Sequence, residues 1–269
     1  MASVKCNDGV ALHFVECGGE EAQPLVLIHG WSASHRSFDN TIPQLAKHFH
    51  VYAPDLRFHG DSDKPSWGFH VSRLAADLHD FLNALGIERP ILLGTSLGCA
   101  VIWAYVELYG DVGLNKLVFV DQAPSQWKMT DWSFCSKGIY DAASLTNIQT
   151  ALSNMNTFAD GNAECCLSHQ LDPNLLEVLK QETLKCDPVQ LGKLMADHAQ
   201  LDWRPILPRI SVPCLNLYGT CSGCFPVEGC RAVGEMIPNC KNVEFEGYNH
   251  WLYLENPDAF VTEVVAFGK

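Results

Sequence analysis

A serine in the first half of the chain has surroundings that favour covalent chemistry. It lies in Gly94-Thr-Ser96-Leu-Gly98, after an apolar run that begins at Ile91 and before a helix-like apolar stretch over residues 101–109. Between a strand and a helix, a Gly-x-Ser-x-Gly motif sets the serine hydroxyl at the tip of a sharp turn. The flanking glycines leave room that a β-carbon would fill. The pattern predicts that Ser96 is a nucleophile, and the alternative is an ordinary turn with a small polar residue.

A serine hydroxyl is a useful nucleophile at neutral pH only when a base takes its proton and an acid orients that base. His250 follows the last expected strand and is the candidate base, with a surface-loop histidine as the alternative. Asp121 ends an expected strand and is the candidate acid. Glu228 is a second candidate, and a chain without the acid is a third. Asp121 could instead only cap the turn that follows its strand.

The elements that would position these residues alternate between strands and helices. Apolar runs predict strands at residues 9–17, 24–30, 50–55, 117–121, 213–219 and 243–245, besides the run before Ser96. Apolar spacing predicts helices at 38–49, 71–85, 101–109, 228–237 and 257–267. This alternation predicts an α/β fold with a mostly parallel sheet and helices on both faces. His29, Ser96, Asp121 and His250 would then lie at the carboxyl ends of strands, where such sheets place their sites.

The alternation stops in residues 122–205, which contain no clear buried strand. Helical spacing there predicts helices at 139–158, 174–185 and 189–201. We therefore expect one discontinuous core, residues 1–121 and 206–269, with an inserted helical cap at 122–205. Trp127 and Trp132 of this insertion, together with Trp31, are candidates for lining a substrate pocket. Aromatic packing between cap and core is an equally good explanation of them.

Composition limits the classes of function. The 269-residue chain is 47% hydrophobic and 18% charged, which supplies a full core, and its net charge is −13. Because nucleic acids and anionic membranes repel an acidic protein, we expect a small-molecule substrate and neither of those partners. The first residues lack the apolar core of a signal peptide, and no run is long enough to cross a membrane, which predicts a cytoplasmic protein. The oligomeric state is left open.

Twelve cysteines are many for this length. In a reducing compartment we expect free thiols and no disulfide framework. Cys221-x-x-Cys224, with Cys230 and Cys240 downstream, invites a zinc or redox interpretation. The spacing does not repeat, however, and no histidine adjacent in the sequence completes a set. No metal site is therefore expected.

Five segments together resemble the α/β-hydrolase superfamily: His29-Gly30-Trp31, Asp55 to Ser62, Gly94 to Gly98, Pro213 to Gly219, and Gly247-Tyr-Asn-His250. Within it, Asp121-Gln-Ala-Pro resembles small hydrolases of the non-haem chloroperoxidase-like or arylesterase-like group. The resemblance implies the α/β-hydrolase fold, with Ser96 as nucleophile and His250 as base. It also implies that the backbone N–H groups of Trp31 and Leu97 form an oxyanion hole, and that neither a metal nor an organic cofactor is needed.

The sequence departs from the superfamily at the acid. Members commonly carry it three residues after the glycine that closes the seventh strand, and Ser222 stands at that position here. Some members take the acid from the end of the sixth strand, which makes Asp121 the expected substitute. Thr95 and Phe58 replace a usual histidine and a usual glycine, and both predict altered walls of the substrate pocket. Asp55 and Arg57 are expected to hold their loop in place.

These observations favour a serine hydrolase that cleaves carboxylic esters of small, largely apolar substrates through an acyl-serine intermediate, with thioesters and lactones as further substrates. One alternative is a cofactor-free dioxygenase on the same fold, which would use a His–Asp pair as its base. Thr95 and Leu97 stand where those enzymes carry histidines, which counts against it. The other alternative is a non-catalytic small-molecule-binding relative, favoured by Ser222 at the usual acid position.

Overall fold

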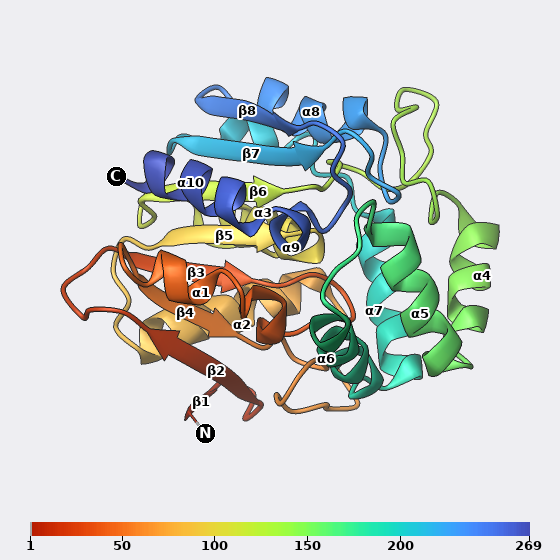
Figure 1. The fold of residues 1–269 in the computed structure, drawn as a ribbon, viewed down its shortest axis with the longest axis horizontal. Helices are drawn as coiled ribbons and strands as arrows, with labels where there is room; N and C mark the ends of the chain where they lie inside the picture. The colour runs from red at the N-terminus through yellow and green to blue at the C-terminus, as the bar shows by residue number, and fades with distance from the viewer. Residues whose placement is uncertain (1) are drawn as a thin grey trace.

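A computed structural model describes residues 2–269, and its centre is one eight-stranded sheet in the order β1-β2-β4-β3-β5-β6-β7-β8 (Figure 1). The β1–β2 and β2–β4 pairs are antiparallel, and all the other neighbours are parallel. The strands are β1 (Ala2–Lys5), β2 (Ala11–Cys17), β3 (Pro24–Ile28), β4 (His50–Pro54), β5 (Ile91–Thr95), β6 (Lys116–Val120), β7 (Cys214–Gly219) and β8 (Cys240–Phe245). The expected mostly parallel sheet is confirmed.

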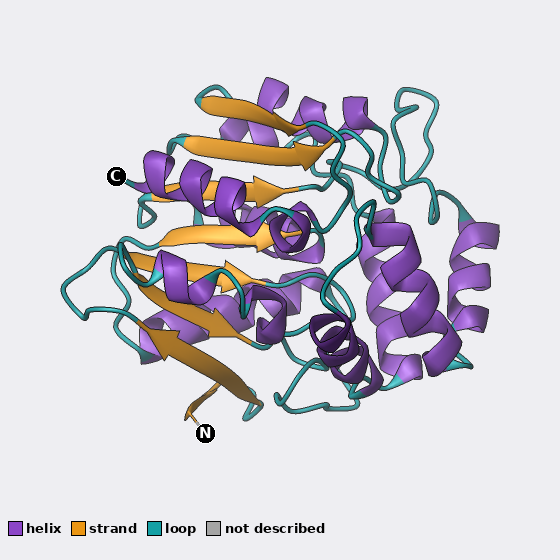
Figure 2. Cartoon of the chain, viewed as in Figure 1, coloured by secondary structure: helices purple, strands orange, loops and turns teal. Residues whose placement is uncertain are grey.

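Helices cover both faces of this sheet (Figure 2). One face packs against α2 (Val71–Ala84), α3 (Leu97–Tyr109) and α8 (Val227–Met236), and the other against α1 (Ile42–Leu45), α9 (Leu252–Glu255) and α10 (Pro257–Gly268). The sequence of strand β3 is continuously apolar because both of its faces are buried. Val26 and Ile28 pack into the first core, whereas Leu25 and Leu27 pack into the second. A strand buried on both faces has no solvent-exposed face, so its sequence does not alternate between apolar and polar residues.

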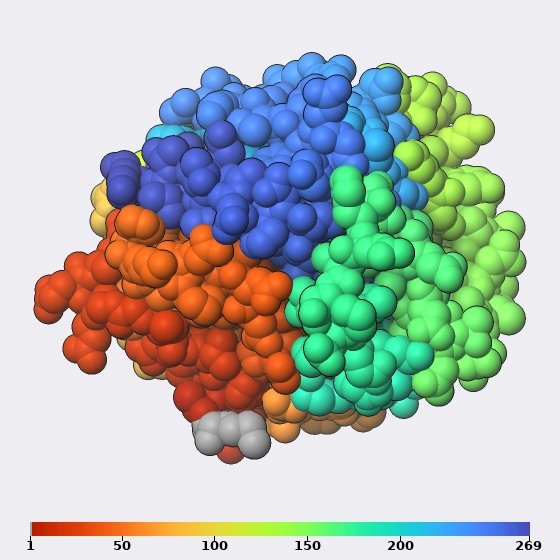
Figure 3. Space-filling model, in the orientation of Figure 1, coloured from red at the N-terminus to blue at the C-terminus, as the bar shows by residue number. Residues whose placement is uncertain are grey.

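Four helices lie between β6 and β7 in the sequence, beyond the carboxyl ends of the parallel strands (Figure 1): α4 (Ala142–Ala151), α5 (Met155–Cys166), α6 (Pro173–Leu184) and α7 (Pro188–Gln200). In the space-filling view their residues cover that edge of the sheet (Figure 3). The single helix expected at 139–158 is wrong, because α4 ends at Ala151 and a new helix begins after Asn154. The Asn154 side chain accepts a hydrogen bond from the Thr157 N–H and so begins α5. The division into a core and a cap domain stays a prediction.

The other differences concern short elements. The helix expected at 38–49 is a 3-10 turn, η1 (His35–Phe38), followed by the one-turn α1, in which Pro43 occupies the first turn. A proline lacks the N–H that a continuous helix would need at that point. Strand β1 and helix α9 were not predicted, because four residues are too few to establish a period. Among residues 2–269, every helix is too short or too polar to traverse a lipid bilayer.

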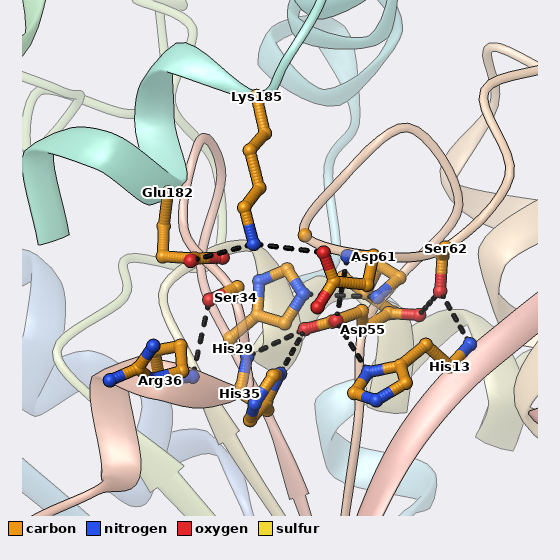
Figure 4. A network of polar contacts seen from close by, with 12 residues as sticks. His13, His29, Ser34, His35, Arg36, Asp55, Asp61, Ser62, Glu182 and Lys185 are labelled. Atoms are coloured by element: carbon orange, nitrogen blue, oxygen red, sulfur yellow. Dashed lines mark hydrogen bonds and ion pairs between the residues drawn. The ribbon is translucent and has the colours of Figure 1, made fainter. Parts of the chain in front are cut away.

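The loop after β4 is held by the buried carboxylate of Asp55 (Figure 4). It accepts hydrogen bonds from the backbone N–H groups of His35 (2.7 Å) and Asp61 (2.9 Å). It also contacts the Nδ1 atoms of His13 (3.0 Å) and His35 (2.9 Å). Burial raises the pKa of Asp55, but the hydrogen bonds from His35 outweigh burial and hold that pKa well below its usual range.

A lysine of the insertion contacts this loop. Lys185, just after α6, lies 2.8 Å from the carboxylates of both Asp61 and Glu182 (Figure 4). Arg57, also expected to hold the loop, is buried and pairs with Asp77 and, at 2.9 Å, with Asp8. The two charged residues after β4 are therefore structural, as expected.

Replacing Asp55 should destabilise the protein in a pH-dependent way. Asp55→Asn should lower the free energy of unfolding at pH 7 by about 3 kcal/mol, because it removes a buried charge from its donors. Because the pKa of Asp55 is lower in the folded protein than in the unfolded chain, its ionised carboxylate stabilises the folded state at pH values above the unfolded pKa of about 3.9. This stabilisation is lost as the pH falls toward the folded pKa. In urea unfolding, the difference between variant and wild type should therefore stay constant from pH 7 to about pH 5 and shrink as the pH falls below about 4.

Asp39→Asn is the matched control for this measurement. Asp39 pairs with Arg36 at 2.6 Å in a half-exposed position, so its loss should cost under about 0.5 kcal/mol. Equal destabilisation by the two substitutions, or a difference for Asp55→Asn that does not change with pH, would contradict the role of the buried carboxylate.

Candidate active site

Ser96 lies on a strained turn between β5 and α3. Its backbone angles are φ 51° and ψ −117°, a conformation that a non-glycine residue rarely adopts. The turn is possible because of its glycines. A β-carbon on Gly94 would lie 2.4 Å from the Gly98 backbone, and one on Gly98 would lie 2.2 Å from the Ile28 carbonyl oxygen. The Ser96 N–H also donates to the Val120 carbonyl at 3.0 Å, which ties the turn to β6.

The candidate base and the candidate acid are in contact. Nδ1 of His250, in the loop after β8, lies 2.5 Å from Oδ2 of Asp121, directly after β6. Both side chains are buried, and Asp121 is 0% exposed. The second candidate acid, Glu228, is exposed in the first turn of α8 and forms no hydrogen bond or ion pair with His250. Of the carboxylates considered from the sequence, Asp121 is therefore the one that reaches the imidazole.

Ser222 contacts the carboxylate instead of supplying one. Its hydroxyl donates to Oδ2 of Asp121 at 2.7 Å, on the same oxygen that meets His250. The other carboxylate oxygen, Oδ1, accepts the Gly219 N–H at 3.0 Å. The position where the superfamily commonly carries an acid thus holds a residue that orients the acid from the neighbouring strand. Sequence reasoning identified the position but not this contact.

A cavity of about 490 Å³ opens beside these residues. Ser96 and His250 both line it, together with Trp31 and residues of α4, α5 and α7 such as Ile148, Phe158 and Met195. None of the described residues that line it is Asp, Glu, Lys or Arg. His198, which also lines it, is buried, and burial lowers its pKa to about 4, so that the ring is neutral at pH 7. The cavity therefore places Ser96 and His250 on a wall without carboxylate, ammonium or guanidinium side chains.

The two expected oxyanion-hole residues flank Ser96. Leu97 begins α3, and the first N–H groups of a helix have no partner within that helix. Trp31 follows Gly30, where a β-carbon would lie only 3.3 Å from the Ser96 Cβ atom. The loop after β3 therefore passes close to the serine, and Gly30 and Trp31 both line the cavity.

Three of the four aromatic residues expected to line the pocket do not line it, and for them the prediction was wrong. Phe58 is completely buried and stacks on Phe69 at 4.9 Å between ring centroids. Trp132 is buried in a separate cluster, with its Nε1–H donated to the Ser125 carbonyl at 3.1 Å. Trp127 packs against a cluster formed by residues of the insertion. Only Trp31 lines the cavity; the others serve in packing, the alternative already considered.

Cysteines adjoin the imidazole, a feature that the sequence did not predict. Cys224 Sγ lies 3.8 Å from Cys166 Sγ, and a ring nitrogen of His250 lies within 4.8 Å of both sulfurs. Hydrogen bonds with Cys165 and Cys166, and the field of His250, hold the pKa of Cys224 well below the usual thiol value. Burial lowers the pKa of His250, but the Cys224 thiolate and the Asp121 carboxylate outweigh it and raise that pKa to about 10. Both shifts favour a Cys224 thiolate paired with a protonated His250 ring.

Comparison with known proteins identifies relatives of the whole chain. A family model described as alpha/beta hydrolase fold matches residues 23–257. A pimeloyl-[acyl-carrier protein] methyl ester esterase of Vibrio atlanticus is 27% identical over 254 residues, which cover 91% of this chain and 94% of the relative. The crystal structure of a bromoperoxidase from Bacillus anthracis is 24% identical, with a TM-score of 0.91 over 99% of this chain and 98% of that one.

A further relative matches part of the chain only. A 1H-3-hydroxy-4-oxoquinoline 2,4-dioxygenase of Pseudomonas putida is 37% identical over 121 residues, which cover 45% of this chain and 46% of the relative. It is a different class of enzyme from the esterase, although both resemble this chain.

The turn at Ser96 can be tested by adding a single methyl group. Gly98→Ala should lower the free energy of unfolding by about 2 kcal/mol or more, because the added Cβ meets a backbone oxygen that cannot rotate away. Gly113→Ala is the matched control, since nothing lies within 4 Å of its added Cβ, and its effect should stay within about 0.5 kcal/mol. Equal stability of the two variants in urea unfolding would contradict the close approach of β3 to this turn.

Proposed function

The chain belongs to the α/β-hydrolase-fold family, and on that premise we propose that it hydrolyses carboxylic esters through an acyl intermediate on Ser96. The expected resemblance to the superfamily and to its small esterase-like group is confirmed. The observation that carries the mechanism is the hydrogen bond between Asp121 and His250, on the wall of the cavity that also contains the strained Ser96.

In this mechanism the Asp121 carboxylate holds one proton of His250 on Nδ1. Nε2 can accept the serine proton once the proton of the Cys224–His250 pair has moved to the Cys224 sulfur. Neutral His250 takes the Ser96 proton while the serine oxygen attacks the ester carbonyl. The backbone N–H groups of Trp31 and Leu97 stabilise the tetrahedral oxyanion, and one such donor contributes about 3 kcal/mol. His250 then gives the proton to the leaving alcohol, and a water molecule repeats the sequence to release the acid.

The walls of the cavity support a neutral, largely apolar substrate. Because none of the described lining residues is Asp, Glu, Lys or Arg, a charged ester would lose its hydration without gaining a salt bridge to such a side chain. Small carboxylic esters fit this environment, and neutral thioesters and lactones share the same carbonyl chemistry. The net charge of −13 supports a small-molecule substrate over nucleic acid or an anionic membrane.

A second candidate function uses the same histidine without the serine. The partial similarity to a Pseudomonas putida dioxygenase favours it, because a buried His–Asp pair could also abstract a proton from a heteroaromatic substrate before reaction with O₂. Thr95 and Leu97 still argue against it. Oxygen uptake with 3-hydroxy-4-oxoquinoline that persists after removal of the Ser96 hydroxyl would favour this candidate over ester hydrolysis.

Removal of the nucleophile tests the proposal directly. Ser96→Ala should lower the turnover of p-nitrophenyl acetate by about 10³-fold or more, because a catalytic serine and histidine act as one unit. A fluorophosphonate probe should label the wild type and not the variant. Ser133→Ala removes an exposed serine and should leave both readouts unchanged. Full turnover or persistent labelling in Ser96→Ala would contradict the assignment.

Ser222 should act as a positioning residue for Asp121. Ser222→Ala removes a hydrogen bond to a carboxylate, worth about 1.5 kcal/mol, and should lower kcat roughly tenfold without changing KM. Ser222→Thr keeps the hydroxyl and should retain most of kcat, whereas Asp121→Asn should lower kcat much further. An unchanged kcat in Ser222→Ala, with normal thermal stability, would show that Asp121 needs no support from the adjacent loop.

A further inference from the structure

Two thiols and the imidazole of His250 converge on one point beside the cavity. Cys166 ends α5 of the insertion, and Cys224 lies in the loop between β7 and α8. Their sulfurs are 3.8 Å apart, and a ring nitrogen of His250 lies within 4.8 Å of each. Since Nδ1 of His250 is engaged by Asp121, Nε2 is the nitrogen left for a third group.

We propose that Cys166, Cys224 and His250 form a binding site for a thiophilic divalent cation such as Zn²⁺, and that the cation blocks hydrolysis by occupying Nε2 of His250. On binding, the Cys166 thiol and the Cys224–His250 pair each release one proton to solvent, which leaves two thiolates and a neutral imidazole nitrogen as ligands. Binding itself depends only on these three side chains. The effect on hydrolysis rests on the proposed function.

The spacing of the sulfurs fits a tetrahedral ion. Two thiolates, each about 2.3 Å from zinc and separated by the tetrahedral angle, lie about 3.8 Å apart. The sulfurs of Cys166 and Cys224 have this separation before any metal is considered. Two sulfurs and one imidazole are ligands that zinc-class ions prefer, and such a set excludes the oxygen-seeking cations Mg²⁺ and Ca²⁺.

The surroundings of the imidazole fit metal binding as well as catalysis. A metal-binding histidine commonly donates its other N–H to a carboxylate, which fixes its tautomer and raises its basicity. Asp121 already provides this contact to His250, and Ser222 orients Asp121. The fourth coordination position of a tetrahedral ion can be filled by another thiol or by water. Cys165 lines the same cavity as Cys166 and Cys224 and could supply its thiol, and the cavity has room for a water molecule.

Two other clusters of potential metal ligands have carboxylates that are already occupied by other partners. The carboxylate of the His13, His35 and Asp55 group is already used by four N–H donors. In the cluster of Cys6 with Asp77 and Asp80, the Asp77 carboxylate is paired with two arginines. By contrast, the Cys166 and Cys224 sulfurs contact one another and the free side of an imidazole.

The proposed site also revises the interpretation of Cys221-x-x-Cys224. That motif lacks a nearby histidine in the sequence, but the fold brings His250 to Cys224 from the loop after β8. Cys221 is not among the converging ligands and is exposed. Its thiol therefore provides a matched control within the same loop.

The test uses Co²⁺ as a spectroscopic substitute for Zn²⁺, with a non-chelating phosphine to keep thiols reduced. It is performed on Ser96→Ala protein, so that binding is measured without reference to hydrolysis. We expect the thiolate-to-cobalt charge-transfer band and the visible bands of tetrahedral Co²⁺, with displacement of both by Zn²⁺. Cys166→Ser and Cys224→Ser should each lose the charge-transfer intensity of one thiolate and bind more weakly, whereas Cys221→Ser should match its parent. Asp121→Asn should weaken Co²⁺ binding about 10-fold to 100-fold.

Hydrolysis is then measured in protein with Ser96 intact. Added Zn²⁺ should inhibit the turnover of p-nitrophenyl acetate, a chelator should reverse the inhibition, and Cys166→Ser should need at least about tenfold more Zn²⁺. Folding of each variant is checked by its thermal transition. Two outcomes would overturn the site: absence of the charge-transfer band from folded protein, or equal Zn²⁺ sensitivity of Cys166→Ser and Cys221→Ser. An intact cobalt spectrum in an inactive wild type would instead contradict the proposed function and leave the metal site standing.

Discussion

The hydrogen bond between Asp121 and His250 is the contact on which the rest of the site depends. A fully buried carboxylate is costly unless it is paired and hydrogen-bonded on every side. Asp121 meets this condition only because β6, β7 and β8 are neighbours in the sheet. Gly219 at the end of β7 and Ser222 in the next loop donate to it, and His250 reaches it from the loop after β8. The order of three strands thus stabilises one buried charge.

The conformation of Ser96, the proposed nucleophile, depends on the adjacent strands. Strand β5 lies between β3 and β6, and Ser96 is held in its strained conformation from both sides. The Gly98 backbone packs against Ile28 of β3, while the Ser96 N–H donates to Val120 of β6. The backbone conformation of Ser96 would cost free energy in an isolated peptide. It persists here because the contacts with β3 and β6 allow no other conformation at this residue. The resulting exposure of the hydroxyl to the cavity is a property of the whole sheet and cannot be assigned to the motif alone.

The insertion between β6 and β7 determines what the reactive groups meet. Its helices form much of the cavity wall, and none of the described residues that they contribute to it is Asp, Glu, Lys or Arg. They are joined to the loop after β4 through Lys185, whose ammonium group bridges Asp61 and Glu182. The same helices bring Cys166 to Cys224, so one insertion supplies both the apolar wall for a substrate and a thiol for a metal ion. Substrate access and metal binding therefore converge on His250.

The sequence by itself determined the alternation of strands and helices, the turn at Ser96, and the placement of His250 and Asp121 at strand ends. These features are local: period, glycine spacing and strand ends are written in consecutive residues. Only the tertiary structure decided between Asp121 and Glu228, gave Ser222 its contact, buried Phe58 against Phe69, and brought Cys166 to a thiol 58 positions away. Hydrophobic period tells which face of an element is buried but not which neighbour it meets, because that depends on the order of strands and the path of the insertion.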